Sequence, residues 1–446
     1  MSVDFLLERF EPARQAEALI WRDETITYGW LLNAYHRLNE DFDQHDIKDG
    51  SVVSLETDFS PLSVVMLLVL MNRKCIIVPL TESVESKKPE FRETAEVEIT
   101  IEIDATEEIN VRHTGRNAAN GFLLSLKERC HPGLVLFSSG STGESKAALH
   151  DFVPMLQKFK QKRHTLRTIT FLLFDHIGGI NTLLYILSNT GCIVTVTDRH
   201  PAAICKAIER YRVQLLPTSP TFLNLLLVSR AYENYDLSSL ELVTYGTEVM
   251  PKETLKRFNR EFPGIRMLQT YGLSEIGILR SKSKSSDSLW VKVGGDGFET
   301  RVVEGLLEIR AQSSMLGYLN APSPFTDDGW FKTGDAVEVD GEYIKILGRK
   351  SEIINVGGEK VYPAEVEGIL QTMADVEDAA VTGEANAITG QVVVARVKLL
   401  TDESLPSFRL RMRAHFKNLP RFQMPQKVIL VDQSLHGNRF KKMRNE

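Results

Sequence analysis

The segment LVLFSSGSTGESKAALH, residues 134–150, joins an apolar run to a cluster of small hydroxyl and glycine residues that ends at Lys146. The apolar run predicts a buried strand, and a Ser/Gly/Thr loop after it can turn tightly and direct backbone N–H groups and hydroxyls at one point. Such a concave arrangement binds phosphate. A P-loop NTPase is disfavoured, because Lys146 follows Ser145 rather than a glycine. Taken alone, the segment also fits an ordinary surface loop.

The composition is that of a globular protein with an extensive core. The 446 residues are 43% hydrophobic and 25% charged, which leaves room for two or three domains. The chain has 53 Lys and Arg against 59 Asp and Glu, a net charge of −6. A general attraction to nucleic acid or to a membrane surface is therefore not expected, and any anion site must be local.

Hydropathy and cysteine use predict a soluble cytoplasmic protein. The start, MSVDFLLERFEPARQ, has no basic region followed by an apolar one, and the most apolar stretch, residues 62–71, is well short of the ~20 residues that span a bilayer. The cysteines lack metal-ligand or Cys-x-x-Cys spacing and are expected to be small core residues in a reducing compartment. They are Cys75, Cys130, Cys192 and Cys205.

The elements that must position the loop alternate between helix and strand. Residues 61–80 combine an apolar helix with the strand CIIVPL, and residues 200–220 place Ile204, Ile208 and Tyr211 at helical spacing before the strand VQLLPTS. Repeated helix-to-strand units favour a layered α/β core.

The C-terminal part of the chain changes character. The segment GEYIKILGRKSEIINVGGEKVYPAEVEGILQTM predicts a hairpin, a Gly-Gly turn and a helix opened by Pro363, with Glu365 and Glu367 suited to its N-terminal dipole. DAAVTGEA, QVVVARVKLL and QKVILVDQS add strands. These elements predict a small α+β domain with its boundary near residues 348–352.

Five further motifs follow the loop along the chain. They are YGTEVMP (245–251), QTYGLSEIG (269–277), SSMLGYLN (313–320), DGWFKTGD (328–335) and GRKSEIINVGGEKVYPAEVE (348–367). Each alone is as compatible with a turn as with a ligand site. In this order they resemble the adenylate-forming superfamily of acyl-CoA synthetases, peptide-synthetase adenylation domains and luciferases, and in style its compact aryl-acid ligases.

The resemblance implies both a fold and a reaction. Residues 1–348 would form a large layered α/β domain that binds nucleotide and acid, and residues 349–446 a small mobile α+β lid, with a hinge near 349–352 at Ser351. A carboxylic acid would attack the α-phosphate of ATP, releasing pyrophosphate and leaving an acyl-adenylate. The thiol of CoA or of a carrier-protein phosphopantetheine would then take the acyl group. With Mg²⁺ present, the protein mainly positions and neutralises phosphates.

The resemblance also implies roles for single residues. Tyr271 would stack near adenine, Gly272 would let a flat substrate approach, Ser274 would reach the α-phosphate and Glu275 would hold Mg²⁺. Asp335 would accept from the ribose hydroxyls. The remaining nucleotide contacts would come from Ser138, Ser139, Gly140, Ser141, Thr142, Gly143, Lys146, Gly246, Thr247, Glu248, Thr270 and Arg349. Gly357 and Gly358 would face the path of the thiol, although a hairpin turn needs glycine equally.

The acid is less well defined. In FLLFDHIGGINTLLY (171–185), His176 matches the histidine that gates the acid beside the adenylate, and the implied pocket also includes Gly178, Tyr245, Gly272 and Gly277. Asp175 is unexpected, because relatives that activate amino acids pair the α-amino group with an Asp in this neighbourhood. The HIGG run favours an amine-free acid, in which case Asp175 is a supporting or solvated residue.

The end of the chain, DQSLHGNRFKKMRNE, departs from the family pattern. Relatives carry a Gly-Lys whose Lys contacts the acid and the α-phosphate. One alignment sets Gly437 on the Gly and Asn438 on the Lys. The preferred one sets Asn438, which tolerates the left-handed conformation, on the Gly and Arg439 on the Lys. Arg is a planar fork rather than a point donor, so slower adenylation is expected unless Lys441 or Lys442 substitutes.

The distribution of charge is the only feature of the sequence that bears on the acceptor of the acyl group. Residues 409–446 contain ten Lys and Arg against Asp432 and Glu446, which fits either a solvated face or a patch for CoA phosphates or an acidic carrier protein, and the run at 158–164 could add to it. An acid–thiol ligase is the leading interpretation. The alternatives are a nucleotide-binding protein with impaired adenylation and an adenylating enzyme with an amine acceptor.

Overall fold

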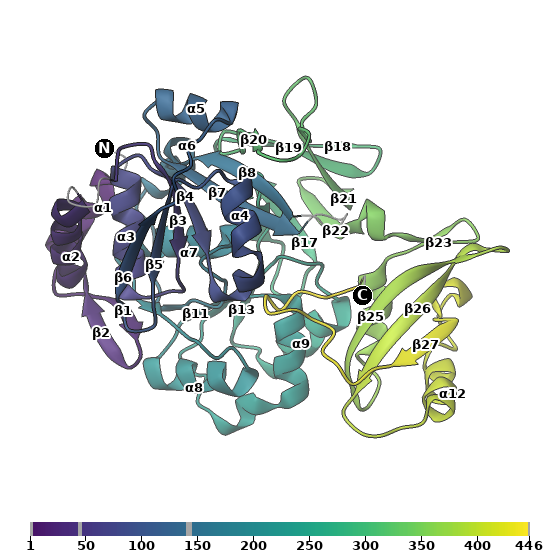
Figure 1. Ribbon diagram of the computed structural model, residues 1–446. Coiled ribbons are helices and arrows are strands. Elements are labelled where there is room, and N and C mark those ends of the chain that lie inside the picture. The colour runs from purple at the N-terminus through teal and green to yellow at the C-terminus, as the bar shows by residue number, and fades with distance from the viewer. Residues whose placement is uncertain (1–2, 43–46, 140–144, 445–446) are drawn as a thin grey trace.

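The computed structural model describes residues 3–42, 47–139 and 145–444 (Figure 1). A large part built on several sheets is followed by a small part at the C-terminus, on the right in Figure 1. The predicted fold class, α/β with a small α+β C-terminal domain, is confirmed. The boundary at residue 348 and the hinge at Ser351 stay predictions.

The first sheet is mixed, with parallel pairing among its central strands and antiparallel pairing at both edges, and it carries the phosphate-type segment at one end. Its strands run in the order β20 (Gly317–Tyr318), β8 (Ser145–Asp151), β7 (Gly133–Ser139), β4 (Ile76–Leu80), β3 (Val52–Glu56), β5 (Ile99–Ile103) and β6 (Ile109–His113). The predicted apolar helix, α3 (Pro61–Asn72), starts with a capping box between Ser60 and Ser63 and has Pro61 in its first turn. These residues define the start of the helix from local sequence. The two serine side chains accept hydrogen bonds from N–H groups that have no partner within the helix, and proline has no N–H group to satisfy.

The second sheet is parallel except at one edge. Its strands run in the order β13 (Arg266–Gln269), β12 (Leu242–Tyr245), β11 (Leu215–Thr218), β9 (Thr168–Ile169), β10 (Ile193–Val194), β1 (Glu17–Trp21) and β2 (Glu24–Thr27). The helices of this large part, besides α3, are α1 (Asp4–Phe10), α2 (Tyr28–Asp41), α4 (Lys88–Thr94), α5 (Gly121–Glu128), α6 (Phe152–Leu156), α7 (Ile177–Ser188), α8 (Pro201–Tyr211), α9 (Pro220–Ser229) and α10 (Lys252–Glu261).

One apolar cluster joins the two sheets through helices α2, α3 and α7. It contains Val53 and Ile101 from the first sheet and Leu19 and Ile193 from the second, all buried. Burial of an aliphatic side chain contributes ~1.5–3 kcal/mol, so this cluster holds the two layers in one arrangement. The segments that follow the strand ends are thereby placed relative to one another.

An antiparallel sheet extends the large part towards the small one. Its order is β16 (Arg280–Ser283), β17 (Trp290–Gly294), β22 (Tyr343–Arg349), β21 (Phe331–Asp340), β19 (Leu306–Ala311) and β18 (Phe298–Val303). A short hairpin, β14 (Gly272–Leu273) and β15 (Gly277–Ile278), precedes it. The turn η6 (Lys350–Glu352) then leads into the small part.

The small part has its own core. Strands β24 (Glu359–Val361), β23 (Ile354–Val356), β26 (Gly390–Leu399) and β25 (Val376–Asn386) form a sheet, and β27 (Lys427–Leu430) pairs with β26. Helices α11 (Pro363–Leu370) and α12 (Leu405–His415) complete it, and Val366, Val381 and Phe408 are buried among them. The predicted Gly-Gly turn is confirmed, since Gly357 and Gly358 have φ values of 62° and 93°.

Two expectations about environment can be compared with the structure. Within the described ranges no helix has both the length and the apolar character to cross a membrane. All four cysteines are free; Cys75, Cys192 and Cys205 are buried as expected, whereas the expectation was wrong for Cys130, which is exposed after helix α5.

Candidate active site

Two residues predicted to bind the nucleotide face each other across one hairpin. Asp335 on β21 and Arg349 on β22 are register partners, and Arg349 Nε lies 2.8 Å from Asp335 Oδ1. The hydroxyl of Tyr271 donates to Asp335 Oδ2 at 2.5 Å. Burial raises the pKa of Asp335, while Arg349 acts in the opposite direction. A buried carboxylate held by a cation and a phenol is a fixed acceptor for hydroxyl groups.

A second group joins the predicted metal ligand to the predicted phosphate lysine. The Tyr318 hydroxyl donates to Glu275 Oε1 at 2.7 Å, and Lys146 Nζ lies 5.4 Å from the centre of the Tyr318 ring. Lys146 and Tyr318 come from the neighbouring strands β8 and β20. Burial and the charge of Glu275 raise the pKa of Tyr318, so the phenol stays a donor. The sequence analysis assigned no role to Tyr318, although it lies in the quoted motif SSMLGYLN.

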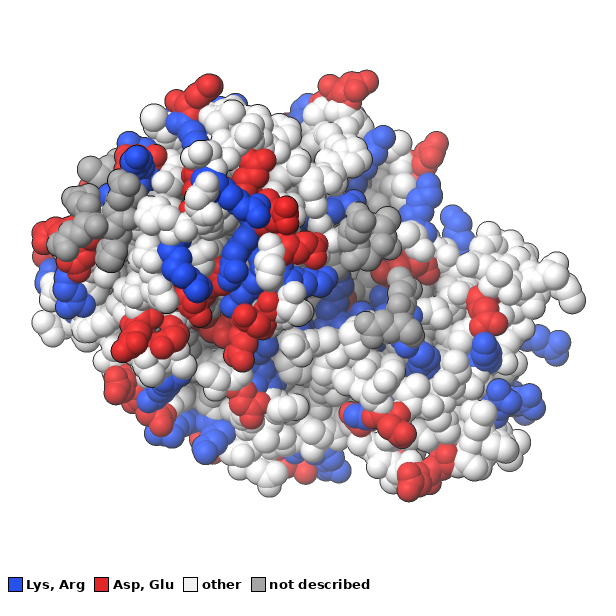
Figure 2. All heavy atoms as spheres, viewed as in Figure 1, with Lys and Arg blue, Asp and Glu red and all other residues white. Residues whose placement is uncertain are grey.

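These two groups are electrostatic neighbours. Burial acts to lower the pKa of Arg349, and the charges of Asp335 and then of Tyr271 and Glu275 more than offset it. The hollow between the large and small parts shows a concentration of Lys and Arg side chains (Figure 2). Anionic phosphates would meet positive charge there.

A buried histidine that the sequence analysis missed forms a hydrogen bond to the loop that carries Ser274 and Glu275. His150 on β8 is fully buried, and its Nε2 lies 2.5 Å from the carbonyl oxygen of Ser274. A carbonyl only accepts, so Nε2 carries the proton, and burial lowers the pKa of His150, which keeps the ring neutral. Met315 N–H also donates to the Glu275 carbonyl at 2.7 Å. The metal-ligand candidate is therefore held by its backbone and by its side chain.

The phosphate-type loop is only partly described. Ser138 on β7 is the register partner of Lys146, and Ser139 ends the same strand. Gly140, Ser141, Thr142 and Gly143 lie outside the described residues. Their assignment to the β- and γ-phosphates stays a prediction.

His176 caps the helix that forms one wall of the predicted acid site. It is the N-cap of α7, and its Nδ1 accepts from the Gly178 N–H at 3.0 Å. Burial, followed by the charges of Arg439 and Lys441, lowers the pKa of His176 to about 3. A Cβ at Gly178 would come within 2.6 Å of Leu172 Cδ1, so a larger residue there would displace the end of that side chain. His176 is thus a neutral acceptor rather than a cation.

The low pKa of His176 predicts an acid-sensitive contribution to stability. An imidazole in the unfolded chain titrates near pH 6.5, so between about pH 6.5 and 3 the unfolded state binds a proton that the folded state does not. Stability is lost as the pH falls through this window. Replacing His176→Asn keeps an acceptor for Gly178, and calorimetry should show a smaller drop in Tm from about pH 7 to 5 than in wild type. The exposed control His164→Asn should leave the wild-type drop unchanged. Equal drops in the His176 variant would contradict the prediction.

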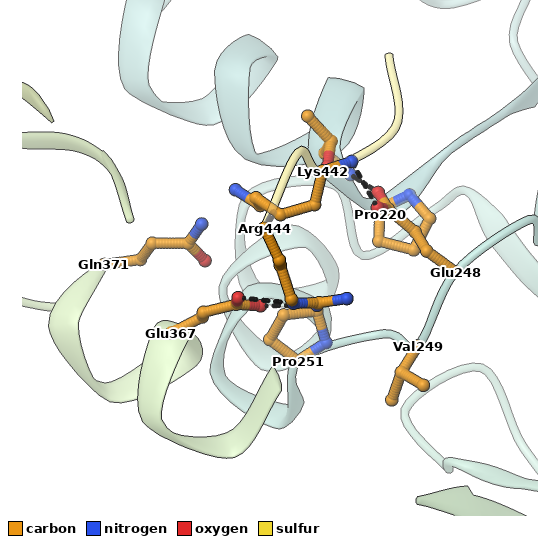
Figure 3. A pocket seen from close by; sticks show the side chains of 9 residues that line it. Pro220, Glu248, Val249, Pro251, Glu367, Gln371, Lys442 and Arg444 are labelled. Atoms are coloured by element: carbon orange, nitrogen blue, oxygen red, sulfur yellow. Dashed lines mark hydrogen bonds and ion pairs between the residues drawn. The ribbon is translucent and has the colours of Figure 1, made fainter. Parts of the chain in front are cut away.

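The residues predicted to bracket adenine also connect the two parts of the molecule. Gly246 faces Thr270, whose Oγ1 a Cβ would approach within 2.6 Å, and Thr247 has a φ of 71°. Glu248 accepts from the N–H groups of Thr221 at 2.7 Å and of Lys442 at 3.1 Å. A narrow pocket lies here, with Arg444 pointing to Glu367 and the Lys442 backbone beside Glu248 (Figure 3). Both carboxylate oxygens of Glu248 are thus occupied.

The remaining predicted acid-site residues are close-packed. Tyr245 on β12 is buried, and its hydroxyl has no hydrogen-bond partner among the described residues. Gly272 and Gly277 lie on the paired strands β14 and β15, where a Cβ on Gly272 would come within 2.7 Å of the Gly277 carbonyl oxygen. Close strand pairing therefore accounts for glycine at 272. In the parts of the chain described, no group of three or more His, Cys, Asp or Glu side chains is arranged to hold a metal.

The C-terminal turn differs from both alignments of the sequence analysis. The left-handed residue is Phe440, with a φ of 49°, so the expectation that Asn438 takes this conformation was wrong. Arg439 Nη2 lies 3.0 Å from Asp175 Oδ2, which also accepts from the Thr81 hydroxyl at 2.9 Å. Arg439, which the preferred alignment sets on the family lysine, thus contacts Asp175, the unexpected carboxylate of the predicted acid site.

Lys441 follows the left-handed residue directly. Residue 441 is exposed, and its side chain makes no hydrogen bond or ion pair with the rest of the described chain. Crowding by the surrounding protein and the charge of Arg349 lower the pKa of its ammonium, while Glu248 and Glu352 act in the opposite direction. Burial has the largest effect on the pKa of Asp335 and of His176. The positive charge of Lys441 makes a smaller contribution, which lowers the pKa of each group. Lys441 is therefore an unpaired cation close to both the nucleotide and acid candidates.

The basic C-terminal residues are more balanced than the local sequence indicated. Acidic residues elsewhere in the chain pair with Arg411 (Glu403), Lys427 (Glu384), Arg439 (Asp175), Lys442 (Asp378) and Arg444 (Glu352 and Glu367). The run at 158–164 follows α6, far from α12 in Figure 1, so the two do not form one patch. Lys158 turns inward and donates to the Ile278 carbonyl at 3.0 Å. Burial, then Arg163 and Arg280, lowers the pKa of Lys158 to about 7.

Carboxylates, phenols and cations thus meet where a layered α/β part joins a small α+β part. The chain belongs to the AMP-binding enzyme family. The family model for AMP-binding enzymes matches residues 8–303, and the model for their C-terminal domain matches residues 365–442. The resemblance drawn from the motifs is confirmed.

Similar proteins illustrate the family. The chain is 30% identical over 329 residues to the indoleacetate–CoA ligase of Aromatoleum aromaticum. The alignment covers 68% of this chain and only 64% of that protein. The structure of the o-succinylbenzoate CoA synthetase from Bacillus subtilis with its acyl-adenylate intermediate is similar with a TM-score of 0.75, at 21% identity, over 99% of this chain and 97% of that one. The amide bond synthetase from Marinactinospora thermotolerans has a TM-score of 0.75 at 19% identity, over 98% and 97% of the two chains. The two solved structures support the fold.

Proposed function

We propose that this protein is an AMP-forming acid–thiol ligase that activates a carboxylic acid with ATP and transfers the acyl group to CoA. The observation that carries the proposal is the convergence of Lys146, Tyr318 and Glu275 with the Asp335–Arg349 pair at the junction of the two parts. These groups supply what phosphate displacement needs, which is fixed acceptors for the sugar and fixed positive charge for the phosphates.

The proposed steps use these residues in order. Asp335 accepts hydrogen bonds from the ribose hydroxyls, Arg349 neutralises the phosphates, and Lys146 stabilises the departing pyrophosphate. A carboxylate oxygen of the acid attacks the α-phosphorus, and the bond to the bridging oxygen of pyrophosphate breaks. The thiol sulfur then attacks the acyl carbon, AMP leaves, and the thiol proton passes to solvent. We propose that the small part turns about residues 349–352, near Ser351, between the two steps.

Glu275 fits a Mg²⁺ ligand. Tyr318 occupies Oε1, and no described residue donates to Oε2. One carboxylate suffices, because Mg²⁺ keeps several waters and is otherwise bound by substrate phosphates. When bound, Mg²⁺ would neutralise phosphate charge, and Tyr318 and the His150-supported loop would hold the carboxylate ready for it.

Tyr318 allows a graded test of this assignment. Replacing Tyr318→Phe removes the hydrogen bond to Glu275 but keeps the ring below Lys146, so we expect the Mg²⁺ concentration for half-maximal ATP binding to rise roughly threefold to tenfold. Replacing Tyr318→Leu removes the ring as well and should also weaken ATP binding at saturating Mg²⁺. Calorimetric titration of ATP at several Mg²⁺ concentrations measures both effects. An unchanged Mg²⁺ dependence in the Phe variant would refute the role of Tyr318.

We further propose that Lys441, rather than Arg439, is the lysine that contacts the acid and the α-phosphate. Phe440 has the left-handed conformation expected of the family glycine, which sets Lys441 on the family lysine. The Arg439 guanidinium is already paired with Asp175, whereas the Lys441 ammonium is unpaired near Asp335 and His176. An ammonium at this position keeps the point charge that Arg would lack.

An acid without an amino group is the favoured substrate. Asp175 Oδ2 accepts from Thr81 and Arg439, so a substrate ammonium would have to lie beside an existing cation. The names of similar proteins that activate indoleacetate and coumarate with CoA agree with an amine-free acid and with CoA as the acceptor. Arg409, Arg413, Lys417 and Arg421 stay candidates for contacts with CoA phosphates or a carrier protein.

The test is acid-dependent ATP–pyrophosphate exchange over a panel of fatty, aryl and amino acids. Exchange with one amine-free class is expected, followed by a thioester product of the correct mass when CoA is added. Exchange without a thioester would shift the assignment to a carrier protein or an amine acceptor, which the same mass measurement identifies. ATP binding without exchange for any acid would favour a nucleotide-binding protein without adenylation.

A further inference from the structure

Asp175 is a buried carboxylate whose partners come from distant parts of the chain. Its side chain is 4% exposed, and Oδ2 accepts from the Thr81 hydroxyl at 2.9 Å and from Arg439 Nη2 at 3.0 Å. Oδ1 has no hydrogen-bond partner in the described chain. A carboxylate in such a place is costly unless a cation accompanies it, and here Arg439 supplies the cation.

The residue after Arg439 is also held by the large part. The Phe440 ring lies with its centre 5.2 Å from that of Phe171 and 5.5 Å from that of Phe222, and the Arg199 guanidinium lies 5.7 Å from its centre. The Ser219 hydroxyl donates to the Phe440 carbonyl at 2.7 Å. Residues 439 and 440 thus form an ionic and an apolar anchor side by side.

The side chains of the residues just beyond contact the small part, although the Lys442 N–H donates to Glu248 of the large part. Lys442 forms an ion pair with Asp378 on β25, and Arg444 lies 2.8 Å from Glu367 on α11 and from Glu352. The Arg396 guanidinium donates to the Met443 carbonyl at 2.8 Å. Lys441 lies between the two sets of anchors, so its position depends on both.

We infer that Asp175 is a positioning residue for the C-terminal turn, which it holds through Arg439 so that Lys441 enters the site of adenylation. This inference rests on the proposed function. Withdrawal of the turn would leave Asp175 without its ion-pair partner, with the Thr81 hydroxyl as its hydrogen-bond donor and Arg199 as the next cation, and the loss of the direct ion pair favours the docked turn. Because Arg439 is one-third exposed, its own cost on release is smaller. Asp175 therefore favours the arrangement for adenylation over rotation of the small part.

The inference predicts a split between the two half-reactions. Removing the charge by Asp175→Asn or Arg439→Gln should slow pyrophosphate exchange about tenfold, because Lys441 is less often in place. Thioester formation from separately prepared acyl-adenylate should be unchanged or faster, since that step needs the turn withdrawn. The double variant should be no slower than the slower single variant, because both substitutions remove one interaction.

Hydrogen–deuterium exchange supplies a readout that needs no turnover. The N–H of Phe440 donates to Gly437, and the N–H of Lys442 donates to Glu248, so a docked turn protects both amides. In the presence of ATP, the peptide covering residues 435–444 should exchange several-fold faster in both single variants than in wild type. Arg260→Gln in the last turn of α10, an exposed residue with no ion pair among those described, is the control, and its peptide 435–444 should show wild-type hydrogen–deuterium exchange.

The outcomes separate this inference from the proposed function. Unchanged hydrogen–deuterium exchange of residues 435–444 in Arg439→Gln would overturn the positioning role. Additive effects of the two substitutions on pyrophosphate exchange in the double variant would also overturn it. Faster exchange of this peptide in both single variants supports it even if no acid in the panel is activated. Circular dichroism of Asp175→Asn verifies that the variant is folded, and Arg439→Gln, altered at a partly exposed site, repeats the test independently.

Discussion

Replacing Lys441→Met should lower the rate of acid-dependent pyrophosphate exchange about 10²–10³-fold, the usual cost of losing one group that stabilises charge in the transition state. The positive charge of Lys441 lowers the pKa of both Asp335 and His176, so it acts on a nucleotide candidate and on an acid-site candidate. Methionine keeps the length of the side chain and removes only the charge. Binding of ATP, measured by calorimetry, should change little.

Two comparisons make the Lys441 prediction specific. Thioester formation from prepared acyl-adenylate should be close to wild type, because adenylation has already occurred. Lys417→Met, which removes an exposed lysine of the small part, should leave exchange unaffected. Wild-type exchange in the Lys441 variant, together with a complete loss in Arg439→Gln, would return the catalytic role to Arg439.

Replacing Glu275→Ala should nearly abolish exchange, with a loss of at least about 10³-fold. The carboxylate is held by the Tyr318 hydroxyl at 2.7 Å, and its backbone is held by Met315, so its position does not depend on a ligand. Loss of the carboxylate that is proposed to bind Mg²⁺ should also remove the Mg²⁺ dependence of ATP binding measured by calorimetry.

The control for Glu275 is an exposed carboxylate that lies outside the site. Glu299→Ala removes the partner of Arg310 on β18 and β19, and exchange should be unaffected. Unchanged pyrophosphate exchange in Glu275→Ala would overturn the metal assignment. Loss of pyrophosphate exchange with an unchanged Mg²⁺ dependence of ATP binding would mean that Glu275 maintains the conformation of its loop and does not bind the metal.

Some of this protein follows from short segments of sequence. Helix α3 was predictable because its cap at Ser60, its first-turn proline and its apolar residues are all local. Asp335, Arg349, Tyr271 and Glu275 were predictable as candidates because each lies in a short motif whose order along the chain defines the family. Tyr318 lies in such a motif too, but its hydroxyl acquires a role only when β20 pairs with β8 and brings Glu275 within reach.

The sequence by itself therefore determined the family, the layered fold and most candidate residues, because local patterns and motif order carry that information. Tertiary structure decided the partnership of Asp175 with Arg439, which lie 264 residues apart, and the identity of the unpaired lysine. The left-handed Phe440 explains why. That conformation costs a non-glycine residue about 1–2 kcal/mol, and burial of a phenylalanine ring contributes about 1.5–3 kcal/mol in return. Besides a local stacking contact with His436, this burial comes from Phe171 and Phe222, which are distant in the sequence, so no local pattern predicts it.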